Sequence, residues 1–113
     1  MDKPKLKDTR GPERKIQDDI IAFLKLRDWH VMETHGNIYQ QGFPDLYCVH
    51  YSHRQRWIEV KNPLKYAFTP AQLDNFPIIS RVAGIWILTA ASDFEYQKLF
   101  KAPNWYAYLE AAN

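Results

Sequence analysis

The sequence predicts a single α/β domain with a mixed β-sheet. Apolar residues recur at helical spacing near the N-terminus, short strand-like runs follow, and a helix-start signal precedes an unbroken apolar run. At 113 residues the chain is long enough for one domain with one core and too short for two. We therefore expect a basic N-terminal arm over residues 1–11 and one domain over residues 12–113.

The first helix is predicted from Pro12 to about Arg27. Proline is tolerated in the first turn of a helix, because the N–H group that it lacks has no partner there. One apolar stripe at helical spacing follows, made of Ile16, Ile20, Phe23 and Leu24. Glu13 falls on the same stripe, three residues before Ile16. We therefore expect the Glu13 carboxylate to point along the buried face of the helix.

Four strands and two further helices are predicted after the first helix. The strand-like runs cover residues 29–34, 46–51, 56–60 and 85–89. Thr69 carries the signal of a helix N-cap, and Gln72 completes a capping box with it. This helix should run towards Val82, with Pro77 kinking or splitting it. A final helix is predicted over residues 93–100, before an aromatic tail.

Asp45 and Glu59 are predicted to face each other across a hairpin. Residue 52, inside the polar turn between the second and third strands, lies midway between them. Residues opposite each other in this way have Cβ atoms roughly 5 Å apart. Two facing carboxylates repel unless a cation lies between them, and a divalent metal is the simplest such cation. Carboxylate oxygens suit Mg²⁺ or Mn²⁺.

Lys61 lies two residues after Glu59 and so projects to the same face of the strand. Its ammonium group there would stabilise a phosphate or orient an attacking water. The main-chain carbonyl of Val60 and the carboxylate of Glu13 are the further ligands that we expect. Together these groups supply what metal-assisted phosphodiester hydrolysis needs. We expect Lys61→Ala to abolish cleavage and to leave the fold intact.

Other interpretations of these residues stay open at this point. Pro-Asp often marks a turn, Glu-x-Lys on a strand is usually a solvated charged pair, and Gln72 suits a helix cap. Cys48, His50 and His53 suggest a zinc site, but a fourth ligand with suitable spacing is missing. We therefore interpret the histidines as surface or DNA-facing groups.

The cysteine content and the charge distribution suggest in which cellular compartment the protein works and that it binds DNA. No stretch approaches the roughly 18 apolar residues of a membrane span, and the basic N-terminus lacks the apolar core of a signal peptide. Cys48 is the only cysteine, which favours a reducing cytoplasm. A basic arm can lie along phosphates, although it can also be a solvated terminus. The residues expected to contact DNA are Lys7, Arg10, Arg14, Lys15 and Lys65.

Four sequence blocks resemble the virus-type replication-repair nuclease (VRR-NUC) domain, a branch of the PD-(D/E)XK nucleases. They are E-x-x-x-Q (13–17), GFPDLY (42–47), WIEVKNP (57–63) and FTPAQ (68–72). The resemblance extends from about residue 12 to about residue 91 and implies a restriction-endonuclease-like αβββαβ core. It implies that Asp45 and Glu59 are metal ligands and Lys61 the catalytic lysine. It also matches Glu13 to the acidic residue of the first helix and Gln72 to a glutamine at the edge of the active site.

The resemblance also implies a substrate and an assembly. Single-domain relatives, often from phages, look like homodimers that cut branched DNA such as four-way (Holliday) junctions. We therefore expect a Mg²⁺- or Mn²⁺-dependent DNA-repair endonuclease in a bacterial or phage-infected cytoplasm, with no small-molecule cofactor and no membrane partner. A flap nuclease, a sequence-specific duplex nuclease and a non-catalytic nucleic-acid-binding module are the alternatives. The aromatic tail (Trp105, Tyr106, Tyr108, Leu109) either forms part of a dimer interface or folds onto its own core.

Overall fold

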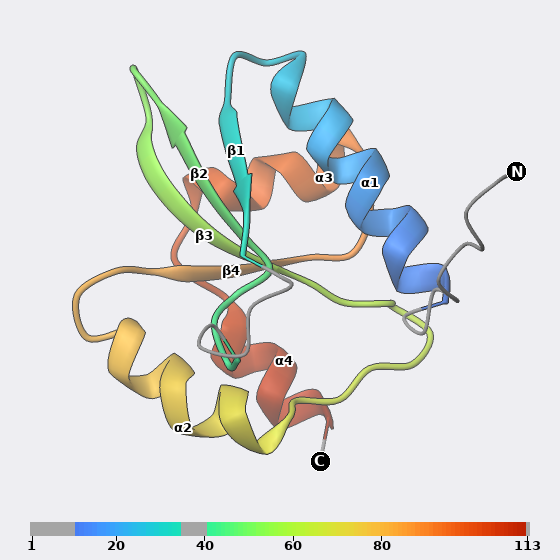
Figure 1. The fold of residues 1–113 in the computed structure, drawn as a ribbon, viewed down its shortest axis with the longest axis vertical. Helices are drawn as coiled ribbons and strands as arrows, with labels where there is room; N and C mark the ends of the chain where they lie inside the picture. Colours follow the sequence, from blue (N-terminus) through green and yellow to red (C-terminus); the bar gives the residue numbers. More distant parts are fainter. Residues whose placement is uncertain (1–10, 35–40, 113) are drawn as a thin grey trace, which may run out of the picture.

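A computed structural model describes residues 11–34 and 41–112 of the chain. Its elements are α1 (Pro12–Lys25), β1 (His30–Glu33), β2 (Leu46–His50), β3 (Arg54–Val60), α2 (Pro70–Ile79), β4 (Ile85–Leu88), α3 (Asp93–Tyr96), the 3₁₀ helix η2 (Gln97–Phe100) and α4 (Trp105–Ala112). The strand order is β1-β2-β3-β4, with β4 parallel to β3 and the other neighbours antiparallel. The predicted α/β class, with an αβββαβ order and a mixed sheet between helices, is confirmed (Figure 1).

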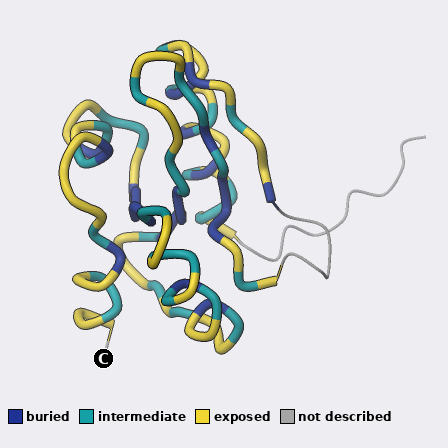
Figure 2. The backbone as a smooth tube through the Cα atoms, turned by 90° about the vertical axis from the view of Figure 1, so that its left-hand side faces the viewer, coloured by how far each residue is buried: buried dark blue, intermediate teal, exposed yellow. Residues whose placement is uncertain are grey.

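Helices cover both faces of the sheet, and each face has its own apolar cluster. On one face, α1 supplies Ile20 and Leu24, which pack with Ile58 of β3. On the other face, Phe76 of α2 and Trp105 of α4 pack against β4. Figure 2 shows that the buried backbone lies mainly in the central strands, with exposed segments around them. No helix in the described part of the chain is long and apolar enough to cross a membrane.

Several boundaries differ from the sequence-based expectation. The helix that begins after Thr69 keeps Pro77 inside it and ends at Ile79, three residues before the expected Val82. Strand β3 begins at Arg54 because the hairpin turn is tighter than expected, and the positive φ of 70° at Arg54 closes that turn. The helix expected over residues 93–100 is divided into α3 and the 3₁₀ helix η2.

The aromatic tail folds onto its own core as helix α4. Trp105 is 2% exposed, and its ring lies 5.6 Å from the ring of Phe76 in an edge-to-face contact. Tyr108 and Leu109 pack against the same cluster, whereas Tyr106 is 54% exposed. Of the two alternatives that the sequence left open, the structure therefore supports the tail as part of the core.

Gly42, in the segment that leads to Asp45, allows α2 to approach closely. Its φ is +83°, and a Cβ atom added there would lie 2.4 Å from the carbonyl oxygen of Ala71 in α2. We expect Gly42→Ala to lower the free energy of unfolding by about 2 kcal/mol or more, from backbone strain and steric overlap together. Urea unfolding measures this change. Gly11→Ala is the matched control, since Gly11 also has a positive φ, +56°, but has nothing within 4 Å. An equal loss of unfolding free energy in Gly42→Ala and Gly11→Ala would show that the close approach of α2 to Gly42 does not cause the loss.

Candidate active site

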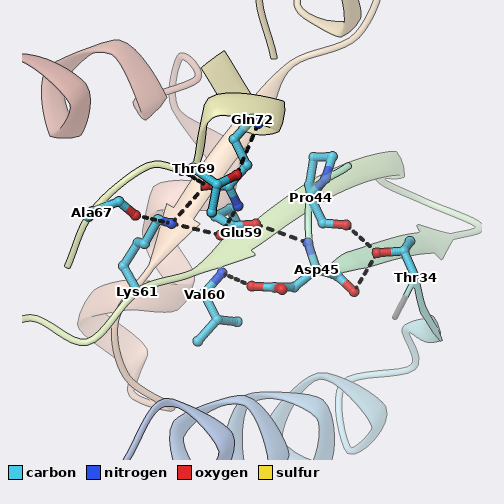
Figure 3. Close-up of polar contacts among 9 residues, drawn as sticks. All are labelled: Thr34, Pro44, Asp45, Glu59, Val60, Lys61, Ala67, Thr69 and Gln72. Atoms are coloured by element: carbon cyan, nitrogen blue, oxygen red, sulfur yellow. Dashed lines mark hydrogen bonds and ion pairs between the residues drawn. The ribbon is translucent and has the colours of Figure 1, made fainter. Parts of the chain in front are cut away.

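The β2–β3 hairpin brings Asp45 and Glu59 together, as predicted. Leu46 pairs with Ile58 in this hairpin, so the same register places Asp45 opposite Glu59. The main-chain N–H of Asp45 donates to Glu59 Oε1 at 3.1 Å, and the N–H of Val60 donates to Asp45 Oδ2 at 2.8 Å. Each carboxylate therefore accepts a hydrogen bond from the opposite segment (Figure 3). Both side chains are buried, with 5% of Asp45 and 2% of Glu59 exposed.

Lys61, the residue directly after β3, joins this pair. Its Nζ atom lies 2.9 Å from Glu59 Oε2 and donates to the carbonyl of Ala67 at 2.8 Å. The ammonium group also lies 4.5 Å from the centre of the Phe68 ring. Only 4% of Lys61 is exposed. The structure thus fixes a positive charge beside the two carboxylates, away from bulk water.

Gln72 connects the start of α2 to the site. Its Nε2 donates to Glu59 Oε2 at 2.8 Å, while its Oε1 accepts from Lys61 Nζ at 3.3 Å. The same Oε1 accepts from the N–H of Thr69 at 3.0 Å, which completes the capping box. The sequence presented the cap and the site as alternatives for Gln72, and the structure shows one side chain serving both. Gln72 is therefore a positioning residue for Glu59 and Lys61.

Thr34 holds Asp45 from the end of β1, and sequence reasoning did not identify this role. The Thr34 hydroxyl donates to the carbonyl of Asp45 at 3.1 Å and also to that of Pro44. The Thr34 N–H donates to the same Asp45 carbonyl at 3.0 Å. A threonine after a strand is too common a pattern to indicate this contact. The adjacent Pro44 and Asp45 are thus fixed from β1 as well as from β3.

Burial of the Glu59 carboxyl, and then the nearby charge of Asp45, raise its pKa from 4.5 to about 8. The positive charge of Lys61, and then the hydrogen bonds that Lys61 and Gln72 donate to Glu59, lower this pKa, but their effect is smaller. When both carboxyls are ionised, the site therefore holds more negative charge than Lys61 and the hydrogen-bond donors neutralise.

The pKa of Glu59 predicts a pH-dependent stability in metal-free protein. Below about pH 4.5 the carboxyl is protonated in both the folded and unfolded chain, so it adds no pH dependence. Between about pH 4.5 and 8 only the unfolded chain releases the proton, so folding becomes less favourable as pH rises. We expect a loss of up to about 1.4 kcal/mol per pH unit from this group. Urea unfolding in EDTA measures it; Glu59→Gln should remove this slope, and an unchanged slope would contradict the assignment.

The donors of the site fit a small, hard divalent cation. Glu59 and Asp45 offer carboxylate oxygens, and a cation would offset the repulsion that raises the pKa of Glu59. Glu13 is half-buried on α1, which packs against the opposite face of the sheet. Within residues 11–34 and 41–112, no three His, Cys, Asp or Glu side chains are gathered as a metal site. Ligation by Glu13 and by the Val60 carbonyl therefore stays a prediction.

The zinc alternative does not fit the contacts of His50. Its Nε2 lies 3.1 Å from the carbonyl of Arg27, and its Nδ1 accepts from the N–H of Ser52 at 3.0 Å. Both ring nitrogens are thus engaged with the main chain. Burial raises the pKa of the Cys48 thiol to about 12, which disfavours the thiolate that zinc requires. His50 and His53 instead pack against the ring of Trp29.

The residues expected to contact DNA are only partly described. Lys7 and Arg10 lie outside the described residues. Arg14 lies 3.4 Å from Asp18 and Lys15 lies 3.0 Å from Asp19, so acidic neighbours one helical turn away offset these charges. Lys65 is exposed. DNA binding by these residues stays a prediction.

Comparisons of the chain with protein-family models, curated proteins and solved structures found no match. Two buried acids, one buried lysine and a positioning glutamine meet at the start of β2, the end of β3 and the first turn of α2 (Figure 3). This arrangement can hold a cation and place a fixed positive charge next to it.

Proposed function

We propose that this chain is a divalent-metal-dependent endodeoxyribonuclease of the VRR-NUC type. The observation that supports it is the buried network of Asp45, Glu59, Lys61 and Gln72. A lysine two residues after one of two facing acids is an arrangement that can support metal-assisted phosphodiester hydrolysis. A buried charge cluster is costly for a fold to keep, because desolvation of its charges outweighs much of their attraction. Such a cost is typical of functional sites.

Each residue has a defined part in this proposal. Asp45, Glu59 and the Val60 carbonyl would hold Mg²⁺ or Mn²⁺, which when bound supplies a Lewis acid for the scissile phosphate. Lys61 presents its ammonium to the negative charge that develops on the phosphate oxygens. Gln72 and the carbonyl of Ala67 keep that ammonium oriented. Gln72 also keeps Glu59 in place through its Nε2 hydrogen bond.

Branched DNA is the substrate that we propose, cut by a homodimer. This part rests on the sequence resemblance and on a physical argument about symmetry. Two copies related by a twofold axis would place two active sites on the two strands of a symmetric junction.

Cleavage of three labelled substrates tests the proposal. A four-way junction, a linear duplex of matched sequence and the matching single strand are incubated with Mg²⁺, Mn²⁺ or EDTA. We expect paired, symmetric cuts in the junction that require metal. Equal cleavage of all three substrates would contradict the proposed preference for branched DNA but would still support a nuclease activity. Absence of cleavage with either metal would contradict the nuclease itself.

A further inference from the structure

The face of the hairpin that carries Glu59 continues beyond the active site. Tyr47 pairs with Trp57, and Val49 pairs with Gln55. Because side chains alternate along a strand, these four residues share the face of Glu59. Figure 1 shows that α2 and α4 lie under the other end of the sheet, while the tip of the β2–β3 hairpin extends away from them. The hairpin face near its tip is thus left outside the helical layer.

A pocket of about 670 Å³ lies between this part of the hairpin and the turn that follows α2. This volume falls in the range of about 300–1,000 Å³ that is typical of small-ligand sites. The residues that line it are Val49, His50, Tyr51, Arg54, Gln55, Arg56, Trp57, Val82, Ala83 and Gly84. The pocket is therefore built from β2, β3 and the segment before β4.

The charge of the pocket is positive. Arg54 and Arg56 line it, the exposed Arg54 supplies its cation at the tip of the hairpin, and the described lining residues include no Asp or Glu. The Arg56 guanidinium donates to three main-chain carbonyls and lies 4.9 Å from the Trp86 ring, in the apolar cluster on the α1 face, so it is turned away from the face of Trp57. Neither arginine forms an ion pair with a described acidic residue. An anionic group such as a phosphate would complement this pocket.

The same pocket offers aromatic surfaces. Trp57 lines it and continues an aromatic run, since its ring lies 4.7 Å from that of Tyr47 and 5.9 Å from that of Phe43. Tyr51 at the tip of the hairpin is 91% exposed. Aromatic rings beside an arginine are a combination on which unpaired nucleobases stack and their phosphates bind. A paired duplex hides the faces of its bases in its own stack, so this surface suits an unpaired strand.

We propose that this pocket binds an unpaired nucleotide of the DNA strand that is cut at the active site. Trp57 and Glu59 are two residues apart on β3, about 7 Å along the strand, which is close to the length of one nucleotide. A strand with its phosphate at Lys61 would therefore reach the pocket with its next bases. This inference rests on the proposed nuclease function and adds that the substrate carries a single-stranded segment beside the cut.

Tryptophan fluorescence tests the contact directly. Trp29, Trp86 and Trp105 are at most 8% exposed, whereas Trp57 is half-buried and faces the pocket. We expect a short oligothymidylate, added in EDTA so that no cleavage occurs, to quench the emission of the wild-type protein. Trp57→Phe should lose that quenching and still bind the oligonucleotide. Equal quenching in the variant and the wild type would overturn the proposal.

Affinity measurements separate the pocket from general attraction to DNA. Tyr51→Ala and Arg54→Glu should each weaken binding of oligothymidylate about tenfold by fluorescence anisotropy in EDTA. The controls are Phe94→Ala, also at an exposed ring, and Lys25→Glu, with the same charge change on α1. Both controls should bind within about twofold of the wild type.

Comparing a blunt duplex with a single strand tests whether the pocket prefers unpaired DNA. Tyr51→Ala should leave the affinity for a blunt duplex unchanged. An equal loss for duplex and single strand, or no loss for either, would overturn the proposal. Failure of the nuclease proposal would be seen separately. If oligothymidylate quenches the wild-type protein but the protein cuts no DNA in the presence of metal, the nuclease proposal is contradicted and the proposed nucleotide pocket still stands.

Discussion

Asp45→Asn is expected to reduce DNA cleavage by about a thousandfold and to leave the fold intact. The Asn side-chain oxygen can still accept the hydrogen bond that the Val60 N–H donates to Asp45, so the hairpin keeps its contacts. The substitution removes one of the two charges that would hold the cation. It also removes the second cause of the raised pKa of Glu59. Single-turnover cleavage and urea unfolding measure the two effects.

Asp45→Asn should lower the cleavage rate without lowering the free energy of unfolding. Stability should be equal to or above that of the wild type at pH 7, because the repulsion between the acids is gone. Asp74→Asn is the matched control, since Asp74 is an exposed acid on the helix α2 that also carries Gln72. Cleavage by Asp45→Asn at the wild-type rate would exclude Asp45 from the site. Loss of both stability and cleavage would make its role structural.

Lys61→Ala is expected to reduce cleavage by about 100–1,000-fold and also to destabilise the fold. From the sequence alone we expected Lys61→Ala to leave the fold intact. In the structure Lys61 is 4% exposed and its ammonium lies 2.9 Å from a Glu59 oxygen. Removing one partner of such a buried pair costs about 3–5 kcal/mol while the other stays charged.

The stability cost of Lys61→Ala should depend on pH. At pH 5 Glu59 is protonated in the folded chain, since its pKa is about 8, so the cost should be small. Above pH 8 Glu59 is charged in the wild type, and the cost should be largest. Urea unfolding at pH 5 and pH 8.5 measures the difference, and Lys25→Ala on the exposed side of α1 is the control. A pH-independent cost would show that the ion pair does not cause it.

The pairing of the two acids could be predicted from the sequence. Short strands on either side of a polar turn define a register, and strand alternation then places Asp45 and Glu59 on one face. The register in the structure is the predicted one, although β3 begins two residues earlier than expected. The capping box of Gln72 was equally clear, since it depends on neighbours only three residues apart. Local spacing was sufficient for these features.

Contacts between distant segments could not be predicted in this way. Asn104 accepts from the N–H of Ile87 and donates to its carbonyl, which satisfies the outer edge of β4 from 17 residues away. Thr34 reaches Asp45, and the side chain of Gln72 reaches Glu59. Each depends on how the elements pack in three dimensions rather than on spacing along the chain. The same is true of the pocket near Trp57.

Binding of Mn²⁺ to the protein without DNA tests most directly whether Asp45 and Glu59 form a metal site. Electron paramagnetic resonance measures free Mn²⁺ as it is titrated into wild-type protein, Asp45→Asn and the control Asp74→Asn at pH 8. We expect about one Mn²⁺ bound per chain in the wild type and in the control, and a large loss of affinity in Asp45→Asn. Equal binding by Asp45→Asn and the wild type, or no binding by the wild type, would contradict the proposed site.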